Sequence, residues 1–242
     1  MSERHWQRPA LATTALALLG ATAVAGCGNS ASTSHASATQ PAGTAAATGP
    51  GSFTAAQLKG ALLTKIGGAS PAAPAEAGDY GALPDVQTSK NTMNGVKVTP
   101  ARCAEATVTG FNSAAFTHAP ASVVTFRVGR DGVSEVLVSA TPEIASTALG
   151  NRLPAGCTHY TATVQGRTFH YSVKEAPFTG LANQARALNV KAAGYAEVDV
   201  WSVVYRGNGF VGAVTIVGPD ASETGAKNLA SQAYAYAAQS LH

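Results

Sequence analysis

The stretch Val198-Asp-Val-Trp-Ser-Val-Val-Tyr205, followed by the turn Gly207-Asn-Gly209 and by Phe210-Val-Gly-Ala-Val-Thr-Ile-Val217, decides the fold. Two apolar runs separated by a short glycine-rich turn predict a β-hairpin. Neither run alternates cleanly between apolar and polar residues, which is typical of strands that are buried on both faces. We therefore expect the hairpin 197–205 and 210–217 to form the central pair of a sheet.

A second hairpin is predicted upstream, from the runs 123–128 and 133–138. If its loop has three residues, with Gly132 in the left-handed conformation, Arg127 lies opposite Glu135. The two side chains would then form an exposed cross-strand ion pair, and the apolar residues of both strands would share the other face.

A third hairpin is predicted for 157–164 and 167–174, around Gln165-Gly166. A two-residue turn places Tyr160 opposite Tyr171 on the core side. The opposite, polar face then carries His159, Thr161, Thr163, Thr168, His170 and Ser172.

Three helices are expected to pack on this sheet. The first follows Thr54 as its N-cap and ends at Gly67-Gly68, and the second begins at Thr141-Pro142-Glu143. The third has capping-box spacing between Asp220 and Glu223. Its apolar stripe consists of Ala226, Leu229, Ala230, Ala233, Ala237 and Leu241.

The remaining segments are less regular. Prolines and glycine predict a loop over 69–84, and one or two short strands are expected over 86–98. The segment 177–194 reads as a connection with a turn of helix over 181–188. Together the elements predict an α+β domain, in which an antiparallel sheet built from hairpins is covered by an N-terminal, a middle and a C-terminal helix.

The N-terminus has the pattern of an exported protein. Arg4 and Arg8 precede an apolar run from Ala10 to Val24, which is shorter than the roughly 20 residues that a spanning helix needs. The run ends in Val24-Ala25-Gly26-Cys27, which resembles the lipobox of bacterial lipoproteins. That resemblance implies a diacylglyceryl group on Cys27, and two acyl chains anchor a protein stably. The alternative is an ordinary secretory peptide that releases a soluble protein.

The expected organisation is therefore a signal peptide over 1–26, a lipidated Cys27 with a disordered tether over 27–52, and an extracellular domain over 53–242. The tether consists almost entirely of Ala, Ser, Thr, Gly and Pro, with a reach of roughly 25 to 30 Å. The net charge is only +3 and no cluster of Lys and Arg occurs, so nucleic acid is not an expected partner.

The chain has three cysteines. Apart from Cys27, the pair Cys103 and Cys157 is expected to form a disulfide, as is usual in exported domains. A metal site is the alternative, but no CxxC or HxxxH spacing supports it. We expect neither a metal nor a cofactor.

The residues that suggest a binding site lie on the polar face of the third hairpin. His159 and His170 would occupy diagonal positions about 7 to 8 Å apart, with Thr161 beside them and no nearby carboxylate to complete a metal site. This predicts a solvated or ligand-lining face. Trp201 is either a sheet-packing aromatic or a ligand platform. No catalytic residue is predicted, because neither a GxSxG nor an SxxK motif occurs.

The order of elements also carries a family resemblance. The stretches 58–64, 99–104, 153–157 and 201–208, behind a lipobox, resemble actinobacterial lipoproteins whose domain is similar to the extracellular sensor domain of mycobacterial serine/threonine protein kinases. The resemblance implies an antiparallel sheet with helices around a ligand-binding cleft and no enzymatic activity. Those kinase domains carry two disulfides, whereas this chain has cysteines for one.

Three functions are compatible with these features. The first is a lipoprotein, anchored on the extracytoplasmic face of the cell membrane, that binds or senses a small or lipidic molecule of the envelope. The second is a structural or accessory protein that binds another envelope protein. The third is an envelope hydrolase without a recognisable motif.

Overall fold

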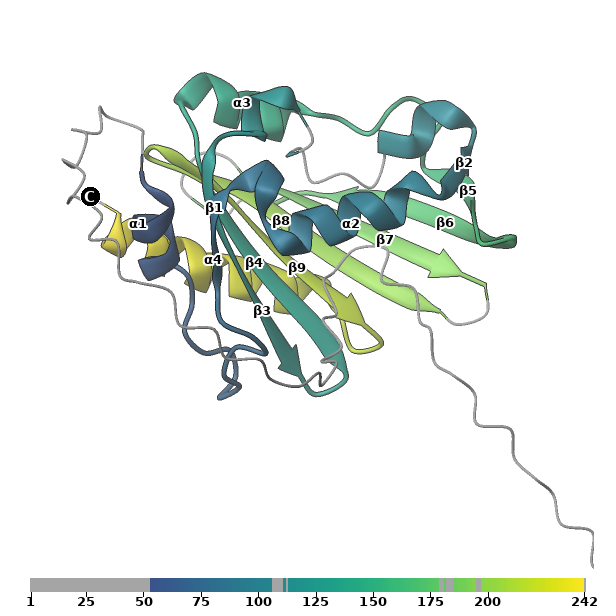
Figure 1. Ribbon diagram of the computed structural model, residues 1–242. Helices are drawn as coiled ribbons and strands as arrows, with labels where there is room; N and C mark the ends of the chain where they lie inside the picture. The colour runs from purple at the N-terminus through teal and green to yellow at the C-terminus, as the bar shows by residue number, and fades with distance from the viewer. Residues whose placement is uncertain are drawn as a thin grey trace, which may run out of the picture.

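In the computed structural model the chain folds around one antiparallel sheet of nine strands (Figure 1). The structure describes residues 53–105, 111, 113–178, 181, 185–194 and 197–241. The strand order is β1-β3-β4-β9-β8-β7-β6-β5-β2. The predicted central hairpin is confirmed, because β8 (Val198–Gly207) and β9 (Phe210–Gly218) occupy the middle of the sheet.

The other strands extend the sheet to both sides by neighbouring antiparallel pairs. They are β1 (Glu76–Asp79), β2 (Val96–Thr99), β3 (Pro120–Val128), β4 (Asp131–Ser139), β5 (His159–Val164), β6 (Arg167–Ala176) and β7 (Ala185–Ala193).

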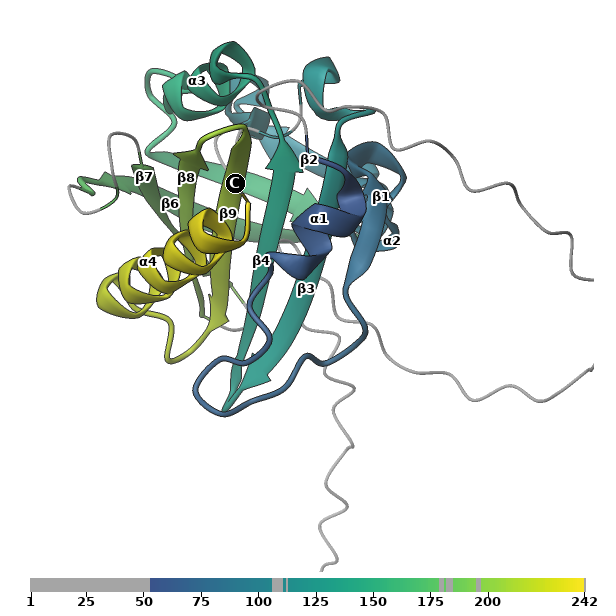
Figure 2. The same ribbon diagram turned by 90° about the vertical axis from the view of Figure 1, so that its left-hand side faces the viewer.

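Helices cover both faces of the sheet, and the two views agree on their sides (Figures 1 and 2). On the first face, which we call the α4 face, lie α1 (Ala55–Gly60) and α4 (Glu223–Ser240). On the second, the α3 face, lie α2 (Pro84–Asn94) and α3 (Pro142–Gly150). Among the described residues, no helix combines the length and the apolar character that crossing a bilayer requires.

Three short 3-10 helices complete the structure: η1 (Tyr80–Ala82), η2 (Ala101–Glu105) and η3 (Ala114–Phe116). The core forms three clusters. One joins α1 and α4 to the α4 face, the second joins α3 to the α3 face, and the third surrounds the disulfide beneath β5, β6 and β7.

The hairpin β5–β6 has the predicted register. Gln165 and Gly166 form the turn with φ angles of 49° and 77°, and Tyr160 lies opposite Tyr171. The two rings stack with their centroids 5.0 Å apart. A two-residue turn with both φ angles positive matches the right-handed twist of the strands, and it fixes which face each side chain occupies.

The predicted register of the hairpin β3–β4 is wrong. Its turn has two residues, Gly129 and Arg130, with Gly129 rather than Gly132 at a positive φ of 59°. Arg127 therefore lies opposite Gly132, and Glu135 lies opposite Val124. Because an odd shift in register moves a side chain to the other face, Glu135 is buried in the core and does not pair with Arg127.

The first helix is shorter than predicted. Thr54 caps α1 in a capping box with Gln57, as expected, but α1 ends at Gly60. The backbone N–H of Leu63 donates to the carboxylate of Glu135 at 2.8 Å. If α1 continued to Leu63, this N–H would instead donate to a backbone carbonyl of the helix. The buried carboxylate of Glu135 accepts it here.

Three further elements differ from the prediction. The segment 69–84, predicted as a loop, contains β1, which pairs with β3, and η1. The segment 84–94 is helix α2, with Pro84 in its first turn, and only β2 of the expected strands follows it. The segment 185–193 is strand β7 and not a connection with a helical turn, because its Leu188, Val190 and Ala192 pack in the cluster around the disulfide. Tertiary packing therefore overrides the helix propensity of its alanines.

The stripe predicted for α4 is confirmed, but its cap is not Asp220. The hydroxyl of Ser222 accepts from the N–H of Gly225 at 3.2 Å, so Ser222 is the N-cap. Asp220 instead pairs with Arg130 of the β3–β4 turn, with an N···O distance of 2.7 Å. In the middle helix, Thr141 caps α3 as predicted.

Candidate functional site

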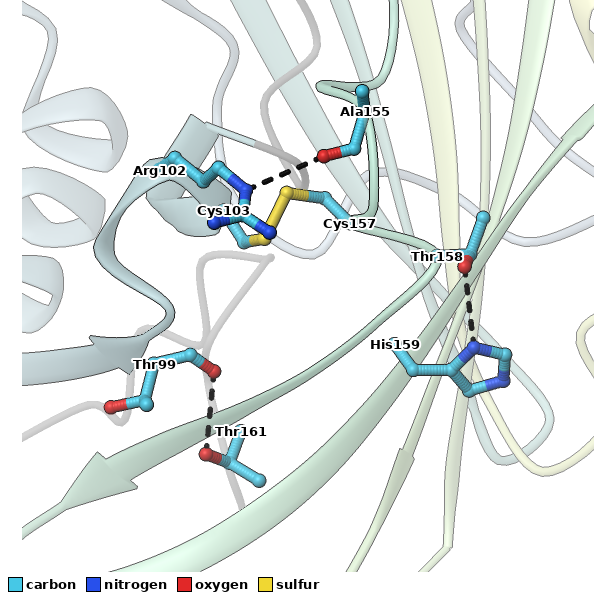
Figure 3. Close-up of a disulfide and its surroundings, with 8 residues drawn as sticks. All are labelled: Thr99, Arg102, Cys103, Ala155, Cys157, Thr158, His159 and Thr161. Carbon is cyan, nitrogen blue, oxygen red and sulfur yellow. Dashed lines mark hydrogen bonds between the residues drawn. A yellow bond between two sulfur atoms is a disulfide. The ribbon is translucent and has the colours of Figure 1, made fainter.

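The predicted disulfide is present (Figure 3). It packs against the α3 face of β5 and β6, and the predicted ligand residues of these two strands lie on their opposite face. Cys103 lies on η2 and Cys157 two residues before the start of β5, and both side chains are fully buried. Beside the bridge, Nε of Arg102 donates to the carbonyl of Ala155 at 3.4 Å. This hydrogen bond joins η2 to the loop that leads into β5. The disulfide itself leaves neither thiol free to bind a metal.

The polar residues of β5 and β6 share one face, as predicted. Thr161 lies opposite His170, and His159 lies opposite Ser172. The face continues across neighbouring strands, because residues opposite each other in antiparallel strands point to the same side. We call it the polar strand face; it comprises Lys97, Thr99, His159, Thr161, Thr163, Thr168, His170, Ser172, Lys174, Asn189, Lys191 and Asp199.

The polar strand face lies on the same side of the sheet as α4 but beyond it, over β2, β5, β6, β7 and the start of β8. Both histidines are exposed, and Thr161 is half-buried. Nδ1 of His159 lies 3.3 Å from the hydroxyl of Thr158, and the hydroxyl of Thr161 donates to the carbonyl of Thr99 at 3.4 Å (Figure 3). The imidazoles and hydroxyls can therefore donate to and accept from a polar ligand or partner.

The one acid of this face is already engaged. Asp199 accepts a hydrogen bond from Asn189 and pairs with Lys191, with an N···O distance of 3.2 Å. Among the described residues, no group of three or more His, Cys, Asp and Glu could hold a metal ion. The face suits neutral or anionic polar groups better than a cation.

Trp201 lies apart from the histidines. It is 8% exposed and belongs to the core cluster of α1 and α4. Its neighbour across the strands is Asn189, so it marks the boundary where the polar strand face becomes core. The structure thus places it as a sheet-packing aromatic, and only His159, His170 and Thr161 of the four predicted ligand residues share an open surface.

A second polar feature was not predicted. A row of hydroxyls crosses four adjacent strands on the α3 face: Thr125, Ser134, Thr215 and Ser202. Ser202 is buried and the other three are half-buried, although β4, β9 and β8 are inner strands. The hydroxyls of Ser202 and Thr215 lie 2.9 Å apart.

This hydroxyl row runs between the cluster of α3 and the cluster of the disulfide. Val136 and Val204 lie on one side of it, and Val200 and Val217 on the other. Helix α2 lies on the same face as the hydroxyl row, but none of its side chains is fully buried. The sequence did contain a signal, because Ser202 and Thr215 interrupt runs that are otherwise apolar.

Two buried ionic groups were not predicted either. Glu135, expected on the surface, is fully buried, and burial raises its pKa to about 7 despite the N–H of Leu63. Glu175 accepts from buried Arg186 at 2.6 Å and from the N–H of Leu153 at 3.1 Å. Burial acts to raise the pKa of Glu175, but these bonds outweigh it and hold that pKa below its usual value. Their partners are distant in sequence, so periodicity gave no signal.

Comparisons with known proteins find similar solved structures, among them two mycobacterial proteins. One is the extracellular domain of PknH from Mycobacterium tuberculosis, with a TM-score of 0.42, 15% identity, and coverage of 60% of this chain and 76% of that chain. The other is a putative uncharacterized protein, the Rv0999 ortholog, from Mycobacterium smegmatis, with a TM-score of 0.39, 16% identity, and coverage of 60% and 77%.

The sequence matches no protein family in the comparison against families, and no curated protein matches it. Both TM-scores lie below 0.5. The function is therefore inferred from the residues of this chain itself.

Proposed function

We propose that this chain is a lipoprotein anchored on the extracytoplasmic face of the membrane through diacylglyceryl-Cys27, and that its folded domain is a non-enzymatic module that binds or senses an envelope molecule. The observation that carries the proposal is the buried disulfide between Cys103 and Cys157, in a chain whose remaining cysteine ends a lipobox. Disulfides persist in oxidising compartments, which agrees with export.

The anchor is tested by metabolic labelling with a fatty-acid analogue. The wild-type chain should take up label and fractionate with membranes, whereas Cys27→Ala should do neither. A matched variant, Cys103→Ala together with Cys157→Ala, should still be labelled, because it retains the acceptor thiol. Uptake that does not depend on Cys27 would contradict the anchor.

Two surfaces support ligand binding. The polar strand face offers the exposed imidazoles of His159 and His170 and the hydroxyl of Thr161 to the polar part of a ligand. The hydroxyl row, with apolar clusters on both sides, has the mixed chemistry of sites for small amphiphilic molecules: mostly apolar walls and a few placed polar groups. Neither surface requires a metal or a cofactor.

The experiment is native mass spectrometry of the full chain, purified from its own membrane under gentle conditions. A mass increment above the lipidated protein is expected. If His159→Ala with His170→Ala removes the increment, the polar strand face holds the ligand. If Ser202→Ala with Thr215→Val removes it, the hydroxyl row does. Thr92→Ala serves as the control, because it removes a hydroxyl that donates only to the carbonyl of Thr88 within α2.

A structural or accessory role is the second candidate. The observation that favours it is that no described helix covers the polar strand face, which leaves an exposed part of the sheet open to a protein partner. An apo mass in every preparation, together with a specific envelope protein crosslinked to residues of this face, would favour this function over the first.

A further inference from the structure

A carboxyl group lies inside the core cluster between α1, α4 and the sheet. Glu135 projects from β4 between Val124 of β3 and Val214 of β9, and it is fully buried. Its Oε2 accepts from the N–H of Leu63 at 2.8 Å. Its other oxygen, Oε1, is buried without a hydrogen-bond partner among the described residues. A buried carboxyl oxygen without a partner is costly and rare in folded proteins.

A phenol group points towards the same place. Tyr205 of β8 is fully buried, and its hydroxyl also lacks a partner among the described residues. Its ring lies over Gly212 of β9, where an added Cβ would lie 2.5 Å from Cζ and 2.7 Å from the hydroxyl. Gly212 in turn lies opposite Leu137, two residues from Glu135 on β4. The ring therefore crosses β9 with its hydroxyl directed towards β4.

Burial raises the pKa of Tyr205 well above its usual value, and the charge of Glu135 raises it further, which agrees with the closeness of the two groups. One group offers an acceptor and the other a donor, yet they do not bond directly. A small molecule that both donates and accepts would satisfy both atoms. A metal ion would need several more oxygen ligands, and the surrounding cluster is otherwise apolar.

We propose that Glu135 and Tyr205 bind one internal water molecule between β4 and β8, which donates to Oε1 and accepts the hydroxyl hydrogen of Tyr205. Buried waters typically bridge polar groups that have no other partner. The water holds the carboxyl in the orientation in which Oε2 binds Leu63. At the other end of the same segment, the hydroxyl of Ser139 accepts from the N–H of Phe53 at 2.8 Å. The hydrated pair thus helps to fasten the segment that begins at Phe53 onto β4.

The test is a double-mutant cycle on the full chain, with Tyr205→Phe, Glu135→Met and the double variant, measured by urea unfolding. Tyr205→Phe should lower the folding equilibrium constant about five- to tenfold, because the water loses a partner and Glu135 is left less satisfied. In the Glu135→Met background the same change should have little effect or improve stability. Tyr234→Phe is the matched control, since this half-buried ring packs edge-on against Tyr205.

If Tyr205→Phe leaves the folding equilibrium constant unchanged or raises it in the wild-type background, the hydroxyl binds nothing and the proposal is wrong. A crystal structure of the full wild-type chain at atomic resolution tests the water directly. Density for one water within hydrogen-bond distance of both oxygens is expected. A direct bond between Oε1 and the Tyr205 hydroxyl, or an empty gap, would overturn the proposal.

Discussion

At the scale of single residues, Glu135 has the most consequences for this protein. Its burial results from a two-residue turn at Gly129 and Arg130, and it accepts from the N–H of Leu63 just beyond the end of the first helix. One carboxyl group therefore connects hairpin register, helix length and core polarity, and its protonation should appear in the stability of the whole domain.

Stability should fall with rising pH because of Glu135. Its pKa is about 7 in the folded protein, against 4.5 as the ordinary value, so the folded state binds the proton more tightly than the unfolded chain. This contribution is fully present below about pH 4.5 and is lost as the pH rises through about 7, a loss of about 3 kcal/mol. Urea unfolding of wild type and Glu135→Gln between pH 4.5 and 8 measures it. Parallel curves for the two proteins would contradict the assignment.

Gly212 should tolerate no side chain. A Cβ at this position would lie 2.5 Å from two ring carbons of Tyr205, which is fully buried and has little room to move. Gly212→Ala should therefore destabilise the protein by about 1 to 3 kcal/mol. The control is Gly132→Ala on β4, where the nearest atom, the carbonyl oxygen of Val217, is 3.9 Å away. Equal melting temperatures for the two variants would refute the close contact.

At the scale of elements, the start of a capped helix is decided by the side chain that accepts from its free N–H groups. α1 and α3 begin at the predicted caps, Thr54 and Thr141, while the cap of α4 lies two residues after the predicted Asp220. The carboxylate of Asp220 forms an ion pair with Arg130 instead of capping α4. The backbone N–H of Asp220 donates to the carboxylate of Asp131 at 3.1 Å. A long-range contact thus displaces a cap that local spacing favours.

The cap of α4 can be checked directly. Ser222→Ala removes the hydroxyl that accepts from Gly225, and it should cost about 1 kcal/mol of unfolding free energy. Asp220→Ala should not lose this capping free energy, because Asp220 does not cap the helix. If Asp220→Ala lowered the helix content and stability more than Ser222→Ala did, the cap would be the one that the sequence spacing suggested.

At the scale of the whole molecule, the sheet is continuous, but its covering changes from one half to the other. α1 and α4 bury the α4 face over β3, β4, β9 and β8, and the polar strand face begins where Trp201 meets Asn189. On the α3 face, the disulfide closes the opposite end of the sheet by joining η2 to the strand entry of β5.

The disulfide should be the main constraint on the unfolded chain. Cys103 and Cys157 are 54 residues apart, and a loop of that length corresponds to about 4 kcal/mol in the chain-entropy model. Reduction, or Cys103→Ser with Cys157→Ser, should lower the unfolding free energy by about that amount. Urea unfolding with and without reductant measures it. A stability that is insensitive to reductant, with both thiols shown to be free, would contradict this.

The sequence by itself determined what local pattern controls: the central hairpin, the β5–β6 register with Tyr160 opposite Tyr171, and the apolar stripe of α4. It also predicted the pairing of Cys103 with Cys157, because these are the two cysteines besides Cys27 in a chain with an export signal. Of the candidate site, it predicted the shared face of His159, Thr161 and His170, because the turn Gln165-Gly166 leaves one register.

Only the tertiary structure decided the rest. The turn at Gly129 and the partners of β4 placed Glu135 in the core, and packing in the cluster around the disulfide made 185–193 a strand despite its alanines. The hydroxyl row exists only because β3, β4, β9 and β8 are aligned. Periodicity specifies which side chains share one strand or helix, whereas the choice of partner strands depends on the packing of the whole sheet.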